Sequence, residues 1–322
     1  MTDGIVSVFG IVLPVFALIG LGLGFRAKGW FGEEVERGLS RFVFTLAVPA
    51  LIVRTLATSG LPDQLPFLYW TAYFTGAFIA WGIGGALSYR RDRDLPRAIS
   101  VGFSSAFSNT VLLGIPLILT AFGEAGSVPL FLLVSIHLPV LMFIGTVLME
   151  VSLRDRDASI LASLKTVGHG LTHNAIFLGI ILGGLLGAFQ VPLPGLVDEV
   201  LRRLGEAAVP CALFAMGMTL VTHRPRSKEA WRREARQAAG MATVKLLIHP
   251  LIVFGLATWF ALPPLWTAAA VLFAACPAGV NTYLFAVTYD KGVAEASTNI
   301  AVTSGIAVVS VTLWLAILQA GM

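Results

Sequence analysis

Long apolar stretches separated by short polar ones run through the whole chain. Each stretch is long enough for a membrane-spanning helix of about 20 residues, and none shows the strict alternation of a β-strand. The pattern therefore predicts an all-α polytopic membrane protein with ten transmembrane helices. The predicted spans cover about residues 4–25, 40–57, 67–88, 98–121, 127–150, 171–189, 200–221, 237–261, 265–287 and 294–319.

Composition narrows the class of protein further. Of the 322 residues, 57% are hydrophobic and 12% are charged, against roughly 25% charged residues in soluble domains. These values exclude a soluble enzyme, a disordered chain and a nucleic-acid-binding domain. Cys211 and Cys276 both lie in apolar stretches, so no disulfide framework is expected.

The basic residues predict how the chain is oriented. If the N-terminus lies outside, 18 of the 22 Lys and Arg residues fall in inner loops. Three others, Arg54, Arg202 and Arg203, fall outside, and Lys245 lies within a span. Because inner loops are enriched in Lys and Arg, we expect a multi-pass plasma (inner) membrane protein with both termini on the extracytoplasmic side.

The loop between the fifth and sixth spans divides the chain into two sets of five. An odd number of spans inserts the second set upside down, as in inverted-repeat transporters. We expect a first repeat over residues 1–151, a cytoplasmic linker over 152–170 and an inverted repeat over 171–322. Pro49 in span two and Pro210 in span seven are a matching pair, although two unrelated kinks would look the same.

Spans four and nine, the fourth of each set, combine helix breakers with polar side chains. Unwound backbone in a membrane must be buried or line a cavity, and the following helix N-termini offer free N–H groups and a partial positive charge. The pattern predicts that helices four and nine are broken and cross at a site for a small anion. The expected substrate-binding residues are Ser108, Asn109, Thr110, Pro277, Ala278, Gly279 and Asn281.

Two points about this site stay open at the level of sequence. Asn109 and Asn281 could contact substrate, or they could merely satisfy the broken backbone. The breaks can also be aligned in two registers. One matches Asn109-Thr110 to Asn281-Thr282, and the other matches Ser108-Asn109 to Pro277-Ala278.

At these residues the chain resembles the auxin efflux carrier family, which includes the plant PIN auxin exporters and bacterial transporters. Its bacterial branch is similar in the run 108–117, Ser-Asn-Thr-x-x-x-Gly-Ile-Pro-Leu, and in the run 276–281, Cys-Pro-Ala-Gly-Val-Asn. Runs 48–51 and 245–250 also fit in order and spacing. The plant exporters carry a proline where this chain has Ser108, and their long central loop is short here, which puts auxin itself in doubt.

The resemblance implies a fold shared with bacterial sodium/proton antiporters and bile-acid transporters. Spans one, two, six and seven would form a scaffold, through which a homodimer is expected. Spans three to five and eight to ten would form a transport domain that moves by an elevator-type alternating-access mechanism. The implied substrate is a small organic anion, a malonate-like or auxin-like carboxylate.

Four ionisable side chains within or beside the spans are candidates for a coupling or charge role: Lys245, His249, His137 and Glu206. Lys245 could snorkel to the inner interface, act as a fixed charge near the crossing, or contact substrate. His249 lies one turn beyond it, and His137 lies near mid-span, where a histidine can relay protons or bond neighbouring helices. Glu206 could pair with Arg202 or Arg203.

The leading prediction is a secondary active or facilitative transporter. A channel-like or sensory protein on the same fold is the alternative, and the scattered acids and histidines argue against an enzyme. No cofactor and no metal site are expected, and the coupling ion could be H⁺ or Na⁺. The glycine runs Gly179-x-x-x-Gly183-x-x-x-Gly187 and Gly20, Gly22, Gly24 predict close helix packing.

Overall fold

The computed structural model describes residues 2–59, 66–153, 172–222 and 238–321, and helices make up most of these ranges. The predicted linker 152–170 lies almost entirely outside them. The elements of the first half are α1 (Thr2–Ala27), α2 (Glu33–Phe42), the π-helix η1 (Val43–Ala47), α3 (Val48–Ser59), α4 (Phe67–Asp92), α5 (Leu95–Ala106), the π-helix η2 (Thr110–Gly114), α6 (Ile115–Phe122), the 3₁₀ turn η3 (Gly123–Gly126) and α7 (Ser127–Leu153).

The second half repeats this alternation of long and broken helices. Its elements are α9 (Ala175–Ala188), α10 (Gly195–Thr222), a helical stretch from 238 that includes the π-helix η4 (Val244–Ile248), α12 (His249–Trp259), α13 (Pro264–Ala275), α14 (Asn281–Tyr289) and α15 (Val293–Ala320). Each predicted apolar stretch is therefore mainly helical where it is described, and spans four and nine are interrupted.

Among the residues that the structure describes, six helical stretches are long and apolar enough to cross a membrane. They are Gly10–Ala27, Glu33–Thr58, Thr110–Leu153, Gly195–Val221, Ala238–Trp259 and Val293–Ala320. Two further apolar helices, α9 and α13, are shorter. The prediction of an all-α protein is confirmed, and these stretches supply several membrane crossings.

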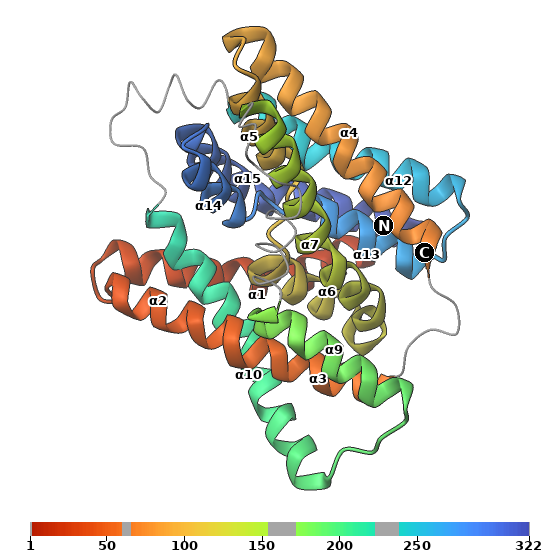
Figure 1. Ribbon diagram of the computed structural model, residues 1–322. Helices are drawn as coiled ribbons and strands as arrows, with labels where there is room; N and C mark the ends of the chain where they lie inside the picture. The colour runs from red at the N-terminus through yellow and green to blue at the C-terminus, as the bar shows by residue number, and fades with distance from the viewer. Residues whose placement is uncertain (1, 60–65, 154–171, 223–237, 322) are drawn as a thin grey trace.

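The helices pack in two groups (Figure 1). In the α1/α10 group, α1 packs on α10, α10 on α3 and α3 on α9. In the α4/α12 group, α4 packs on α5 and α12, α12 packs on α13, and α7, α14 and α15 complete the group. The groups meet where α15 and α6 pack on α1, α10 packs on η2, and α7 packs on α3 and α9.

Glycines bring the helices of the α1/α10 group into backbone contact. A Cβ on Gly22 would lie 2.1 Å from the carbonyl oxygen of Phe214, and one on Gly217 would lie 2.0 Å from that of Ile19. Close packing is also found at Gly179 and Gly183, whereas Gly20 and Gly24 face open space. The predicted glycine packing is confirmed within one chain at three of these positions, Gly22, Gly179 and Gly183.

Three π-helical segments each precede a proline. Pro49, Pro116 and Pro250 lie two residues beyond η1, η2 and η4. Proline has no N–H, so the carbonyl four residues earlier loses its α-helical partner, and wider turns are one way to accommodate this. Before Pro250 that carbonyl belongs to Leu246, which accepts a hydrogen bond from Trp314 Nε1 at 2.9 Å.

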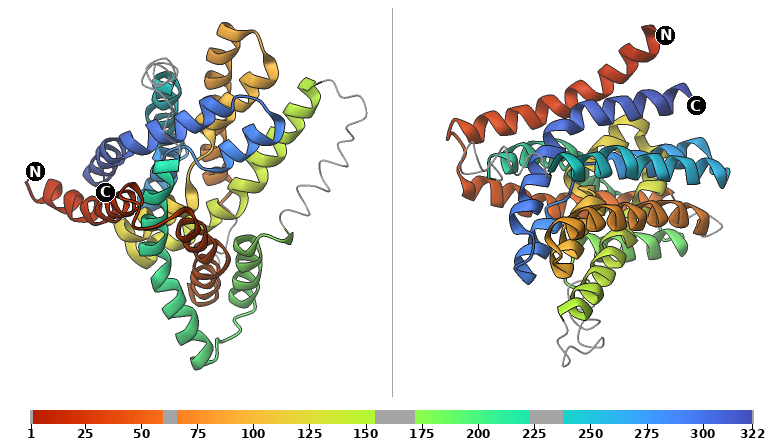
Figure 2. Two further views of the ribbon diagram at one scale, coloured as in Figure 1. Left: turned by 90° about the vertical axis from the view of Figure 1, so that its left-hand side faces the viewer. Right: turned by 90° about the horizontal axis from the view of Figure 1, so that it is seen from above.

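The ends of the chain lie on the same side of the molecule. α1 and α15 pack together and run antiparallel, so that the first turn of α1 and the last turn of α15 are close (Figure 2). An even number of crossings would give this arrangement.

Candidate functional site

Both predicted helix breaks are present. Residues 107–109 separate α5 from η2, and residues 276–280 separate α13 from α14. These non-helical residues lie deep in the molecule, where backbone polar groups need partners.

The two breaks cross and bond to each other. The backbone N–H of Asn109 donates to the carbonyl of Pro277 at 2.8 Å, and the N–H of Gly279 donates to the carbonyl of Phe107 at 3.1 Å. Each break thus supplies one donor and one acceptor to the other. Exchange of these bonds removes much of the cost of unwinding two helices inside the molecule.

Ser108 lies opposite Ala278 in an isolated antiparallel β-bridge at the centre of the crossing. This pairing matches neither register considered from the sequence and is one residue away from the second. Gly279 permits the close approach, since a Cβ there would lie 2.9 Å from the carbonyl oxygen of Ser108 and 3.0 Å from the Phe107 ring.

The two asparagines have different surroundings. Asn109 is buried and caps η2, with its Oδ1 accepting from the N–H of Leu112 at 3.3 Å and its Nδ2 lying 3.9 Å from Met216 Sδ. Asn281 is partly exposed in the first turn of α14 and faces a pocket. Asn109 therefore satisfies broken backbone, while Asn281 is the asparagine that a ligand in the pocket would meet.

The pocket lies beside the crossing, between the two helix groups, with a volume of about 130 Å³. Its polar lining residues are Thr110, Ser135, Asn174 and Asn281. Its apolar lining residues are Phe44, Val111, Val134, Leu138, Pro139, Ile176, Phe177 and Ile180. Asn174 and α9 belong to the α1/α10 group, so a ligand here would touch both groups.

Lys245 is fully buried and points at the crossing. Its Nζ donates to Ser108 Oγ at 2.9 Å and to the Ala274 carbonyl at 2.5 Å, and lies 3.5 Å from His249 Nδ1. The snorkelling alternative is therefore wrong, because the three donors of the ammonium group already have acceptors inside the α4/α12 group.

His137 reaches the crossing through Tyr73. The Tyr73 hydroxyl lies 3.1 Å from His137 Nδ1 and 3.4 Å from Ser108 Oγ. Neither His137 Nε2 nor His249 Nε2 has a hydrogen-bond partner in the described part of the chain. Sequence reasoning missed Tyr73, because a tyrosine in an apolar span is equally typical of simple packing.

Two residues of α15 support the crossing from behind and were also missed. Thr303 Oγ1 accepts from the backbone N–H of Ala278 at 3.1 Å. Asn299 Nδ2 donates to the carbonyl and the Oγ of Ser104, each at 2.9 Å. The polar run 297–299 in an otherwise apolar span was the signal that could have found this face.

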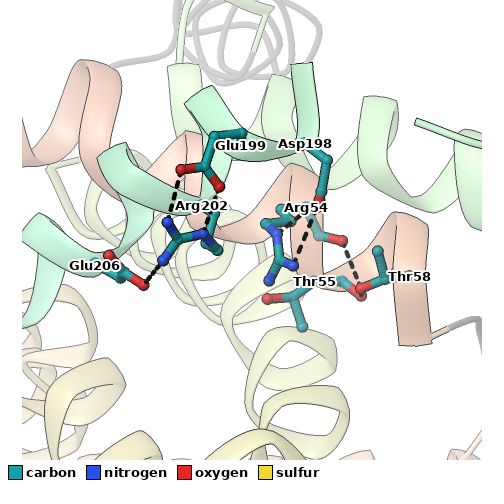
Figure 3. A network of polar contacts seen from close by, with 7 residues as sticks. All are labelled: Arg54, Thr55, Thr58, Asp198, Glu199, Arg202 and Glu206. Carbon is teal, nitrogen blue, oxygen red and sulfur yellow. Dashed lines mark hydrogen bonds and ion pairs between the residues drawn. The ribbon is translucent and has the colours of Figure 1, made fainter. Parts of the chain in front are cut away.

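Glu206 lies away from the crossing, on the exposed face of α10 (Figure 3). It pairs with Arg202, one of the two partners considered from the sequence, and Arg202 also bonds both carboxylate oxygens of Glu199 at 2.8 Å. Nearby, Arg54 of α3 pairs with Asp198 of α10 at 2.7 Å. The structure thus joins Lys245, His249 and His137 at the crossing but leaves Glu206 out.

The charges around the crossing are positive or neutral. η2 continues into α6, and both this helix and α14 begin at the crossing, so the partial positive charges of their N-termini lie there. Lys245 adds an ionisable amine behind Ser108. Such surroundings favour a small anion over a cation.

Comparison with known proteins identifies the family of the chain. A family model described as membrane transport protein matches residues 7–315. The chain belongs to the membrane transport protein family, that of the auxin efflux carriers. The predicted resemblance is confirmed, and this is a family of transporters rather than of enzymes.

Curated members of the membrane transport protein family are similar over their whole length. A protein named "Putative malonate transporter" from Rhizobium meliloti (strain 1021) is 28% identical over 98% of this chain and 97% of its own. An uncharacterized transporter from Methanothermobacter thermautotrophicus is 27% identical over 95% of this chain and 97% of its own. Another, from Methanocaldococcus jannaschii, is 22% identical over 94% of this chain and 96% of its own. This membrane transport protein is therefore a multi-pass membrane protein.

Proposed function

We propose that this membrane transport protein is a secondary active or facilitative transporter of a small organic anion. The substrate would be a carboxylate, malonate-like or auxin-like, bound where helices four and nine cross. The observation that carries the proposal is the crossing itself, in which two helix N-termini adjoin a pocket that reaches both helix groups, and Lys245 bonds Ser108 within the crossing. The name of the Rhizobium relative supports a malonate-like substrate.

Within this site, we assign direct substrate contact first to Asn281 and Thr110, which line the pocket. An amide Nδ2 and a hydroxyl can both donate to a carboxylate. Ser108, Asn109, Pro277, Ala278 and Gly279 would shape the crossing and hold the helix N-termini in place. Residues Lys245, His249 and His137 would set its charge.

The membrane topology belongs to the same proposal: ten spans, arranged as repeats 1–151 and 171–322 joined by the linker 152–170, with both termini outside. Ion pairs support it by joining loops expected on one face. Lys291 lies 3.8 Å from Asp94, so the loop before α15 meets the loop before α5, and both are predicted inner loops.

Further pairs support the same topology. Arg97 pairs with Glu295 at the inner ends of α5 and α15. Arg54 and Asp198 join the predicted outer ends of α3 and α10. The local two-fold relation between the two breaks supports the inverted repeat.

The α1/α10 group is the proposed scaffold, and the α4/α12 group is the proposed transport domain. The first packs intact helices closely at Gly22 and Gly217, and the second holds both breaks. Movement of the second group against the first, with the anion between them, would give elevator-type alternating access. The scaffold would also carry the interface of a homodimer in the plasma membrane.

Uptake by proteoliposomes tests the function. With a carboxylate panel that includes malonate, a carrier gives saturable uptake and counterflow, whereas a channel-like protein gives voltage-driven current with weak saturation. Loss of one charge-assisted hydrogen bond costs about 1.5–3 kcal/mol, so Asn281→Ala should weaken apparent substrate affinity by roughly tenfold to a hundredfold. Thr288→Ala, exposed at the far end of α14, is the matched control. Absence of uptake of every carboxylate, or wild-type kinetics in Asn281→Ala, would contradict the proposal.

A further inference from the structure

Lys245 has a full set of hydrogen bonds but no countercharge. Its neighbours are a hydroxyl, a carbonyl and an imidazole, from Ser108, Ala274 and His249. The other titratable groups facing this cluster are Tyr73 of α4, His137 of α7 and the Cys276 thiol. No carboxylate of the described residues contacts it, and an unpaired buried charge costs several kcal/mol.

The environment of Nζ suits both the charged and the neutral amine. An ammonium group donates three hydrogen bonds, and Ser108 Oγ, the Ala274 carbonyl and His249 Nδ1 can each accept one. A neutral amine donates two and accepts one, which His249 can supply by moving its own proton to Nδ1. Nζ can therefore make all of its hydrogen bonds whether the amine is protonated or neutral.

An anion at the crossing would provide the countercharge that Lys245 lacks. Ser108 separates Lys245 from Asn109 and Thr110, and Thr110 lines the pocket. Anion binding must then favour the protonated amine, and protonation must favour the anion by the same factor, because such coupling is reciprocal. Lys245 belongs to the α4/α12 group, so its proton would move with the substrate.

We propose that each substrate anion is carried together with one proton, which is held on Nζ of Lys245. The inference rests on the proposed transport function and names its coupling ion. The proton comes from water on the side where the anion binds and passes to the amine. It returns to water on the opposite side after the anion leaves, when Lys245 again lacks a countercharge.

The stoichiometry can be measured as an equilibrium gradient. The protein is reconstituted into proteoliposomes, and labelled malonate is supplied at equal concentration on both sides. Valinomycin with equal K⁺ on both sides clamps the membrane potential at zero. With about pH 7 outside and about pH 8 inside, cotransport of one proton holds roughly a tenfold accumulation of malonate, because one pH unit and a tenfold gradient are equal free energies. A carrier without proton coupling gives equal concentrations.

Substitution of Lys245 tests whether this residue carries the transported proton. Lys245→Gln keeps a donor at the crossing but cannot be protonated, so we expect malonate exchange at raised substrate concentration and no accumulation driven by pH. Lys291→Gln, at the inner surface, is the matched control and should accumulate malonate as the wild type does. Accumulation in Lys245→Gln equal to the wild type would overturn the assignment.

The wild-type measurement tests proton cotransport even if Lys245→Gln does not fold. Malonate counterflow without pH-driven accumulation would overturn proton cotransport and leave the proposed function standing. Absence of counterflow with malonate and with every other member of the panel would overturn both.

Discussion

In the α1/α10 group the charged side chains lie near helix ends, where Arg54 meets Asp198 and Arg202 meets Glu199 (Figure 3). In the α4/α12 group, Lys245 and two histidines are fully enclosed. Of the described residues, every buried polar side chain except Glu36 belongs to the α4/α12 group or to the η2–α6 segment at its boundary. Apolar helices thus enclose few polar side chains in the α1/α10 group and surround a polar cluster in the α4/α12 group.

Glycine serves two purposes in the molecule. Gly22 and Gly217 in the α1/α10 group, and Gly102 in the α4/α12 group, let intact helices approach closely, which favours fixed packing. Gly279 instead lets two broken helices touch. Mutations at the two kinds of glycine should therefore separate loss of folding from loss of transport.

The largest effect is expected at Gly22. Alanine there would place its Cβ 2.1 Å from a backbone oxygen of α10, and backbone cannot give way as a flexible side chain can. Overpacking of this kind costs about 1–3 kcal/mol and occasionally more, so thermal unfolding in detergent should shift strongly to lower temperature. Gly20→Ala, on the same helix with open space around it, should unfold like the wild type, and equal shifts in both variants would refute the packing account.

A smaller loss of stability with a larger loss of transport is expected for Gly279→Ala. Its Cβ would press on the Ser108 carbonyl and the Phe107 ring, which displaces the crossing by a few tenths of an ångström. We expect about 1–2 kcal/mol of destabilisation and at least a tenfold lower uptake rate, measured in the same proteoliposomes. Gly305→Ala, in open space on α15, is the control. Normal uptake by Gly279→Ala would mean that the crossing geometry is not needed.

Tyr73→Phe removes one hydroxyl from the buried cluster. The hydroxyl lies between His137 and Ser108, and its loss leaves a buried ring nitrogen without a partner, at a cost of about 1–3 kcal/mol. Uptake should fall severalfold while the chain still folds. Tyr89→Phe, on the surface near Arg93, should leave both stability and uptake unchanged; a matching loss there would show that the effect is not specific to the cluster.

The smallest effect is expected at the Arg54–Asp198 pair. Both side chains are about one third exposed, and ion pairs of this kind contribute about 0–1 kcal/mol. A double-mutant cycle of Arg54→Ala and Asp198→Ala, read by thermal unfolding, should give a coupling energy below about 1 kcal/mol. A coupling of several kcal/mol would mean that charge, and not only glycine packing, holds the α1/α10 group together.

Much of the architecture could be predicted from local pattern. The length of the apolar stretches predicted the helices, and prolines, glycines and asparagines predicted both breaks, because these features act within a few residues along the chain. Sequence proximity likewise predicted that Glu206 could pair with Arg202 or Arg203, and the structure has the pair with Arg202.

The partners of buried groups could not be predicted. Helical spacing places His249 beside Lys245, but nothing in the sequence shows that Lys245 points at Ser108 or that Tyr73 joins Ser108 to His137. These contacts span many residues along the chain and depend on how the helices cross. The register of the crossing was missed for the same reason, since Ser108 and Ala278 meet through backbone bonds that carry no side-chain signature.

Accessibility of residue 281 from both sides of the membrane tests whether the two helix groups move against each other around the site. In a background with Cys211 and Cys276 replaced by Ala that still transports, Asn281→Cys is treated with an impermeant maleimide in right-side-out and inside-out vesicles. We predict labelling from either side and slower labelling when malonate is present. Labelling from one side only, unchanged by any member of the carboxylate panel, would contradict alternating access at the crossing.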